Sequence, residues 1–143
     1  MFCACIFLNS MIYAQEDSQV YKVVDEMPYF QGCEDFPTYR ERAKCGERKM
    51  LDFIYKRMLY PPEARENNVQ GMVVVQFVIA RDGYLEDIEL IRDIGSGCGE
   101  AAMSTIEDMN EMDAPPFTPG VNKGKVVPVE YTLPIRFKMA TLK

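Results

Sequence analysis

Residues 125–138 alternate between apolar and polar side chains without a break. This period of two predicts a β-strand with one buried face, and the residues expected to point inward are Val127, Val129, Tyr131, Leu133, Ile135 and Phe137. Backbone donors alternate as well, so Pro128 and Pro134 both remove an N–H group from the same lateral edge. Because proline belongs on edge strands, we expect pairing through the odd-numbered residues and an edge that is open or only partly used on the other side.

A second strand is predicted over residues 71–80, and its expected inward residues are Val73, Val75, Phe77 and Ile79. Asp82-Gly83 follows between two apolar runs, which predicts a hairpin whose two central turn residues have positive φ. The returning strand is expected over residues 84–92, with Ile88 and Leu90 inward. These segments together predict an antiparallel sheet.

Helical spacing begins after Cys45 and is predicted to end at Tyr60, because two prolines follow. A short helical turn is expected over residues 61–68, since proline is favoured in a first helical turn. A further helix is predicted over about residues 100–112, with Ala102, Ile106 and Met109 on one stripe. We expect residues 113–124 to form a loop.

Residues 2–14 carry no charge and are followed by polar residues. The run is too short to cross a bilayer and ends on a small residue, so residues 1–14 are predicted to be a signal peptide cut near Ala14. A buried N-terminal strand is the alternative. Residues 15–44 lack a sustained period and are predicted to be an extended arm on the domain surface, with a short strand at residues 21–24.

Cys33 and Cys45 flank a charged, turn-rich stretch. In an oxidising compartment this spacing suits a disulfide, whereas in the cytosol both thiols would stay reduced. With Cys98, the mature chain has three cysteines, which leaves a zinc site without its fourth ligand. No metal is expected.

The chain has no histidine, which excludes Ser-His and Cys-His catalytic chemistry. A net charge of −6 argues against binding to nucleic acid. The glycine-rich residues 95–99 could cradle a phosphate, but they lack a P-loop lysine and precede an acidic helix. Cys98 could be an activated thiol, but with no base beside it the expected role is a packed small side chain.

Charge is spread unevenly, with nine acidic and one basic residue at 86–113 but five basic and one acidic at 114–143. The final strand is therefore the basic element. An exposed edge strand can accept a strand from another chain, which favours partner binding; the alternative is a charge pattern that serves only solubility.

Several motifs in order resemble one known family over about residues 51–139: Tyr60-Pro61, Asp82-Gly83, Pro119-Gly120 and Leu133-Pro134-Ile135. The chain resembles the C-terminal domain of the TonB energy-transducer family, in the form common in Bacteroidota. The resemblance implies an α+β, two-layer domain at residues 45–143, with helices on one face of a small three-stranded antiparallel sheet (TonB/TolA C-terminal-like).

The resemblance also implies docking, without cofactor or catalysis, onto outer-membrane TonB-dependent transporters in the periplasm. The transporter's TonB box would add beside the last strand, and force would come from the inner-membrane ExbB and ExbD motor. The implied receiving residues are Val126, Val127, Pro128, Val129, Glu130, Tyr131, Thr132 and Leu133, with Tyr60 and Pro61 as a family signature.

The alternative function is an unanchored secreted adaptor that pairs its open edge with a second copy as a homodimer. Retention of the first apolar segment would instead anchor the chain in the inner membrane. The transporter and its ligand are not predicted.

Overall fold

A three-stranded antiparallel sheet forms the centre of the computed structural model, which describes residues 19–139. The elements in chain order are β1 (Tyr29–Phe30), α1 (Tyr39–Arg57), α2 (Pro62–Glu66), β2 (Gly71–Ile79), β3 (Leu85–Arg92), α3 (Cys98–Asp108), the short 3-10 helix η1 (Met109–Glu111), β4 (Phe117–Thr118), β5 (Gly120–Asn122), β6 (Lys125–Val127) and β7 (Val129–Phe137). The predicted signal peptide, residues 1–14, lies outside the described residues.

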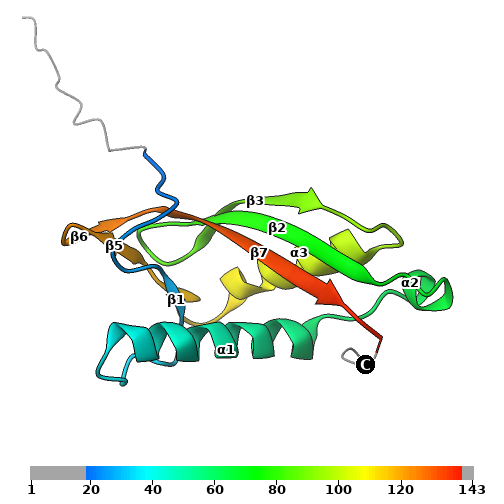
Figure 1. Cartoon of the computed structure of the whole chain (residues 1–143), viewed down its shortest axis with the longest axis horizontal. Coiled ribbons are helices and arrows are strands. Elements are labelled where there is room, and N and C mark those ends of the chain that lie inside the picture. The colour runs from blue at the N-terminus through cyan, green and yellow to red at the C-terminus, as the bar shows by residue number, and fades with distance from the viewer. Residues whose placement is uncertain (1–18, 140–143) are drawn as a thin grey trace, which may run out of the picture.

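The sheet order is β3-β2-β7, with β2 in the middle (Figure 1). The β2–β7 register runs from Gly71 opposite Phe137 to Ile79 opposite Val129. The predicted inward residues of β2 are fully buried: Val73, Val75, Phe77 and Ile79. The expected alternation of β7 is also confirmed, because its odd-numbered residues are buried or half-buried.

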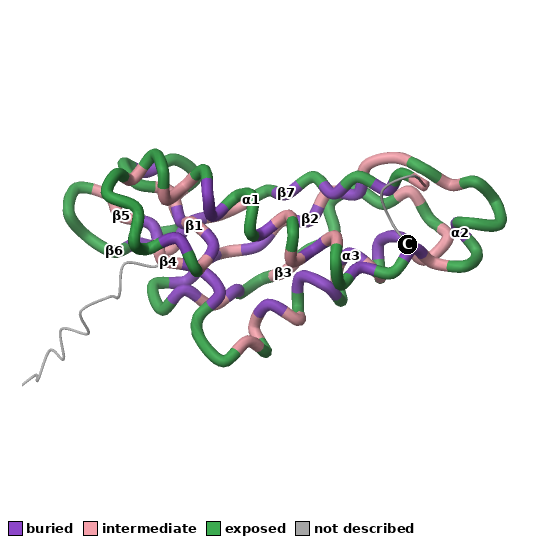
Figure 2. Tube along the Cα trace, turned by 90° about the horizontal axis from the view of Figure 1, so that it is seen from below, coloured by how far each residue is buried: buried purple, intermediate pink, exposed green. Residues whose placement is uncertain are grey.

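α1 and α3 cover the inward face of this sheet (Figure 1). Met50 and Ile54 of α1 join Ala102 and Ile106 of α3 in the core. Buried residues recur along β2, β7 and α3, whereas the hairpin turn of β5 and β6 is exposed (Figure 2). The predicted α+β, two-layer arrangement is therefore confirmed. Among residues 19–139, no helix combines the length and apolar character needed to cross a membrane.

α1 begins at Tyr39, earlier than the sequence analysis predicts, so the last part of the expected extended arm is helical. Thr38 and Glu41 form a capping box: the Thr38 hydroxyl accepts from the Glu41 N–H at 3.2 Å, and the Thr38 N–H donates to the Glu41 carboxylate. This reciprocal cap satisfies orphan donors of the first turn. α1 ends at Arg57, slightly before the end that the sequence analysis predicts at Tyr60.

The N-terminal arm contributes to the core instead of only covering its surface. β1 pairs with β4, and Phe30 is 5% exposed with its ring edge-on to Phe117 at 5.5 Å. The predicted strand at residues 21–24 is reduced to an isolated bridge at Tyr21. The position of the N-terminal arm is set by pairing with residues far away in the sequence, and such pairing leaves no periodic pattern of apolar residues within the arm itself.

The β2–β3 hairpin occurs at Asp82-Gly83, but with a turn other than the predicted one. Ala80 pairs with Tyr84 across a three-residue loop, and of the two central residues only Gly83 has positive φ, at +86°. Asp87, at φ +50°, lies at an irregularity in the strand register. Ile88 still packs on the core, and Leu90, opposite the fully buried Val75, faces Gly99 of α3. Both predicted inward positions are therefore confirmed, although Leu90 is 37% exposed near the end of the strand. A bulge of this kind interrupts the period of two.

The predicted strand over residues 125–138 is split at Pro128 into β6 and β7. β6 pairs with β5 across a turn in which Lys123 and Gly124 both have positive φ. The expected loop at residues 113–124 therefore contains β4 and β5. The predicted stripe of α3 is confirmed, since Ala102, Ile106 and Met109 are fully buried.

Candidate functional site

β7 has two lateral edges, and within the described residues only one of them is fully paired. β2 follows β7 along its whole length. On the opposite edge, the Tyr21 N–H donates to the Pro128 carbonyl at 3.0 Å and the Glu130 N–H donates to the Tyr21 carbonyl at 2.8 Å. No strand among residues 19–139 pairs with this edge beyond Glu130. We call the edge from Glu130 to Arg136 the docking edge.

The docking edge offers more acceptors than donors. Thr132, Pro134 and Arg136 face the same lateral direction as Glu130, because backbone groups alternate along a strand. Pro134 has no N–H, and the Arg136 N–H already donates to the Tyr55 hydroxyl at 3.2 Å. Thr132 is therefore left as the donor, while the carbonyls of residues 130, 132, 134 and 136 point outward.

The sequence-predicted receiving residues divide into four groups in the structure. Val126 and Val127 belong to β6 and pair with β5. Pro128 and Glu130 bond to Tyr21, while Val129, Tyr131 and Leu133 pair with β2. Thr132 remains on the open side. The sequence analysis missed Tyr21 and Tyr55, which cover the two ends of the edge through contacts that no local pattern reveals.

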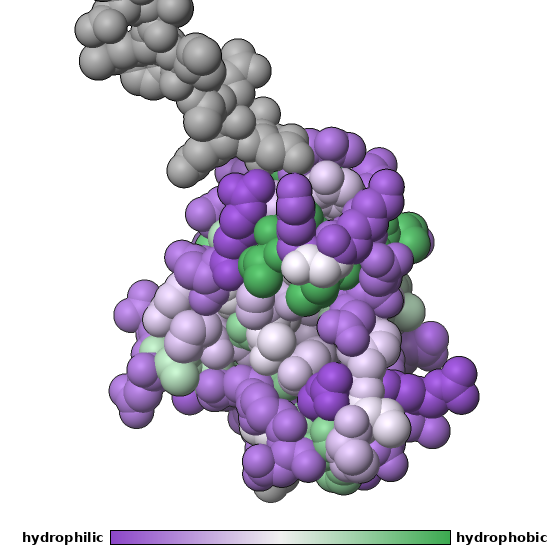
Figure 3. Space-filling view, turned by 90° about the vertical axis from the view of Figure 1, so that its left-hand side faces the viewer, coloured by the Kyte–Doolittle hydropathy of each residue, from purple (hydrophilic) through white to green (hydrophobic). Residues whose placement is uncertain are grey.

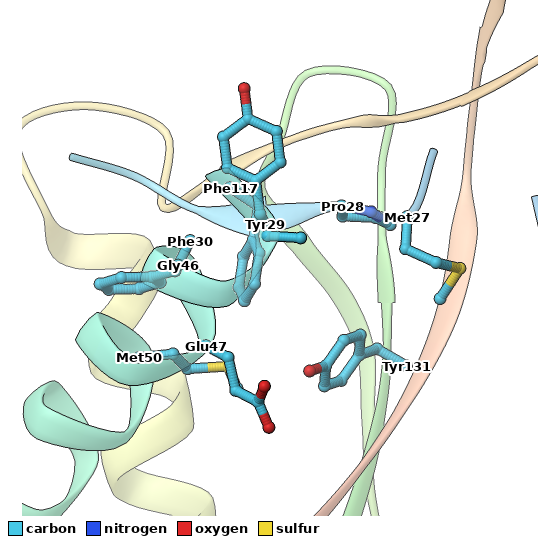
Figure 4. A pocket seen from close by; sticks show the side chains of 10 residues that line it. Met27, Pro28, Tyr29, Phe30, Gly46, Glu47, Met50, Phe117 and Tyr131 are labelled. Carbon is cyan, nitrogen blue, oxygen red and sulfur yellow. The ribbon is translucent and has the colours of Figure 1, made fainter. Parts of the chain in front are cut away.

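Two hollows lie on opposite faces of the docking edge. The inner pocket, about 280 Å³, lies between α1, β1 and β7 (Figure 4). It is lined by Met27, Pro28, Tyr29, Phe30, Ala43, Gly46, Glu47, Met50, Phe117 and Tyr131. The outer pocket, about 310 Å³, is lined by Lys22, Met27, Gln76, Glu130, Tyr131 and Thr132. Met27 and Tyr131 therefore separate the two pockets.

Tyr131 forms one wall of the inner pocket. Its ring stacks on Phe77 at 5.5 Å with an interplanar angle of 16°. Burial raises the pKa of the Tyr131 hydroxyl, and the Glu47 carboxylate on α1 adds to that increase. Both side chains point toward the same space between α1 and β7 (Figure 4). The pocket thus combines aromatic walls with a single acidic group.

Tyr60 and Pro61 lie near the other end of β7. The Tyr60 ring packs edge-on against Phe137 at 5.7 Å, and its hydroxyl donates to the Val69 carbonyl. Burial raises the pKa of this hydroxyl, with a smaller contribution from Cys98. Pro61 directly precedes α2. These contacts assign a structural role to the family signature.

The glycine-rich turn before α3 does not leave its amides available to an anion. The N–H groups of Ile94, Gly95 and Gly99 donate to Asp93 Oδ1 at 2.7, 3.0 and 3.0 Å. The carboxylate therefore occupies the place that a phosphate would need. Cys98 is fully buried, and burial together with Asp93 raises the pKa of its thiol. The Cys98 thiol is therefore a packed side chain that stays protonated.

Cys33 and Cys45 form a disulfide with their Cα atoms 5.9 Å apart. It joins the segment after β1 to α1. Lys49 Nζ on the next turns of α1 also donates to the Gly32 carbonyl at 2.9 Å. These links hold β1 against α1 beside the inner pocket.

The β5–β6 end of the molecule exposes a few apolar side chains. Val20, Val23 and Val126 are 41%, 84% and 44% exposed. Figure 3 views this end and shows hydrophobic groups among mostly hydrophilic ones. Lys123 and Lys125 lie in the same hairpin, so the basic character expected for residues 114–143 is found here as well as on β7.

Comparison with solved structures supports the fold. The solution structure of the Helicobacter pylori TonB C-terminal domain, residues 179–285, is 18% identical with a TM-score of 0.51, covering 75% of this chain and 88% of that one. A shorter form, residues 194–285, is 20% identical with a TM-score of 0.47, covering 64% and 91%. Comparison with curated protein sequences gives no match.

The family comparison covers the sheet, α2, α3 and the docking edge. The model of the Gram-negative bacterial TonB protein C-terminal family matches residues 56–139, which is more than half of the chain. The N-terminal arm and nearly all of α1 precede the matched region. The chain therefore belongs to the TonB C-terminal family.

Proposed function

We propose that this domain docks the TonB box of outer-membrane TonB-dependent transporters in the periplasm, by adding the box as a strand at the docking edge of β7. The observation that carries the proposal is the edge itself, which is unpaired by any strand of residues 19–139 between Glu130 and Arg136. Membership of the TonB C-terminal family supports this class of partner. The domain acts in transport and not as an enzyme.

The backbone groups of the edge define what an added strand must supply. Four outward carbonyls, at residues 130, 132, 134 and 136, need N–H donors from the partner. Only the Thr132 N–H is available to donate to a partner carbonyl, because Pro134 lacks an N–H and the Arg136 N–H bonds to Tyr55. Affinity in strand addition comes mainly from such main-chain bonds, so the partner contributes chiefly its own amide N–H groups.

Docking alone does not move a transporter plug. In the proposed function the force comes from the inner-membrane ExbB and ExbD motor, and the docked strand transmits it to the transporter. A strand pulled along its own axis loads all its ladder bonds together. The edge of β7 suits this geometry because β7 is bonded along its whole length to β2.

The same edge could pair with a second copy and form a homodimer. Two docking edges would face each other with an excess of carbonyls, since each offers Thr132 as its available donor. This mismatch favours a foreign strand over self-pairing. Sedimentation velocity across a concentration series separates the two, because only self-association changes the sedimentation coefficient with concentration.

The experiment uses synthetic peptides that cover the periplasmic N-terminal segments of TonB-dependent transporters, titrated into the ¹⁵N-labelled protein. We expect the largest shift at the Thr132 amide, together with slower hydrogen exchange there. Matched controls are two versions of each peptide, one N-methylated at its odd-numbered residues and the other at its even-numbered residues. The version whose methyl groups replace the N–H groups that face β7 should not bind, and the other should bind nearly as well as the unmodified peptide. Shifts that avoid β7 would reject the proposal.

A further inference from the structure

We propose that the inner pocket receives one apolar side chain of the docked strand and thereby selects among partner peptides. This inference rests on the proposed docking at β7 and adds the chemistry that the partner must present. The pocket is adjacent to the docking edge, since Tyr131 of β7 is one of its walls.

The alternation of a strand connects the edge to the two pockets. Neighbouring residues of an added strand point to opposite faces of the sheet. A residue beside Tyr131 on the inward face is within about 5 Å of its Cβ, the distance of a cross-strand pair. Its side chain therefore enters the inner pocket, and the next side chain meets the outer pocket on the other face.

The walls of the inner pocket favour an apolar occupant. Met50, Phe30 and Phe117 are 2%, 5% and 3% exposed, so apolar side chains already buried in the core form its floor. Glu47 is exposed at the rim. A charged occupant would lose its hydration against this floor, whereas an apolar side chain gains by leaving water.

β1 and α1 approach each other closely because residue 46 is glycine. A Cβ at Gly46 would lie 2.9 Å from the Phe30 nitrogen and 2.9 Å from Tyr29 Cβ. The wall is fixed further by the Met27 N–H, which donates to the Tyr39 hydroxyl at 2.7 Å, and by the disulfide. The pocket is thus preformed instead of depending on a ligand to assemble it.

The wall that shapes the pocket lies outside the family match. All lining residues except Phe117 and Tyr131 precede residue 56, where the matched region begins. The shared domain supplies the docking edge, and the N-terminal arm with α1 adds the selective wall. Selection of an apolar peptide side chain by this wall distinguishes this chain from a domain that has only the docking edge.

The outer pocket requires a different side chain. Lys22 and Glu130 lie in its lining, and the Gln76 amide donates to the Thr132 hydroxyl at 3.2 Å. These polar groups match a polar or charged residue. The preferred peptide therefore has an apolar residue followed or preceded by a polar one at the level of Tyr131.

The test measures affinity for the tightest-binding transporter peptide, with each position in turn replaced by Gly, Ala, Val, Leu or Phe. We expect one position at which Leu binds about tenfold more tightly than Ala, as burial of a large aliphatic side chain predicts. Ala43→Phe, which fills the pocket from α1, should reduce that ratio below about threefold. Lys44→Phe adds the same ring at an exposed neighbouring position and should keep the full ratio.

The outcomes separate this inference from the proposed function. Peptides that shift Thr132 but show no dependence on side-chain size at any position would overturn the inference and leave docking intact. An equal Leu-to-Ala ratio in Ala43→Phe and Lys44→Phe would overturn it too. If no peptide shifts Thr132, both proposals fail. Should Ala43→Phe not fold, the peptide series on the unmodified protein still decides.

Discussion

The hydroxyl of Tyr55 on α1 accepts a hydrogen bond from the backbone N–H of Arg136 on β7, at 3.2 Å. This contact places α1 beside the lateral edge of β7 that β2 does not use. It satisfies an edge donor without extending the sheet. A helical side chain thus covers part of an edge that would otherwise be open to any strand.

Replacing Tyr55 by Phe should release the Arg136 N–H for a docked strand. We expect a loss of about 1 kcal/mol in stability, the usual net contribution of one hydrogen bond. Peptide affinity should increase by about two- to tenfold, since the edge gains a donor. Urea denaturation and calorimetric titration measure the two effects. Tyr84→Phe, on the distant β2–β3 hairpin, should change neither; unchanged affinity in Tyr55→Phe would refute the competition.

Proline substitutions distinguish the two edges of β7. Val129 is fully buried and pairs with Ile79, so Val129→Pro should cost more than about 3 kcal/mol and abolish folding at elevated temperature. Thr132 is exposed and lies on the docking edge, so Thr132→Pro should cost about 1 kcal/mol and weaken peptide binding. Hydrogen exchange on the free protein should show a protected Val129 amide and a fast Thr132 amide. Equal protection would contradict the edge assignment.

The alternation in the sequence predicts the sheet because burial and strand period coincide there. Val73, Val75, Phe77 and Ile79 lie where the pattern expects them, all fully buried. The positions of Pro128, just before β7, and Pro134, within it, likewise predict which lateral edge stays open. The local sequence pattern is sufficient to predict these features, because each of them depends on residues that are neighbours along the chain.

Other features depend on partners distant in sequence. α1 buries only Cys45, Gly46, Met50 and Ile54, so its polar first turns have weak periodicity. The signal for its start was the capping pair Thr38 and Glu41, hidden in a stretch that otherwise suggests turns. β1, the inner pocket and the bond from Arg136 to Tyr55 join segments with no shared period, and therefore could not be predicted from the sequence.

The disulfide should stabilise the fold through its link between the arm and α1. Removing it in Cys33→Ala/Cys45→Ala should cost about 2–3 kcal/mol, as expected for a loop of this length. Urea denaturation of that variant and of the reduced protein should agree. Cys98 is fully buried, so an alkylating reagent should not modify it in the native state. The same midpoint with and without reductant would show that the link contributes nothing.

Stability should fall at alkaline pH because two buried acidic groups and one half-buried group keep their protons in the folded state. Burial is the main cause that raises the pKa of the Cys98 thiol above 9.0 and of the Tyr60 and Tyr131 hydroxyls above 10.0. Above those ordinary values the unfolded chain loses protons that the folded chain retains. The unfolded state then binds fewer protons, and the free energy of unfolding decreases as pH rises. The full contribution is present below about pH 9.

Urea denaturation between pH 7 and pH 11 measures this loss. We expect a flat region up to about pH 9 and a progressive decrease above it. Cys98→Ala should remove the earliest part of the decrease, because the thiol has the lowest ordinary pKa of the three groups, and leave the later part due to the tyrosines. Tyr60→Phe should reduce that later part, since Tyr60 then no longer ionises on unfolding. A free energy of unfolding that stays constant to pH 11 would mean that these groups ionise in the folded protein as readily as in the unfolded chain.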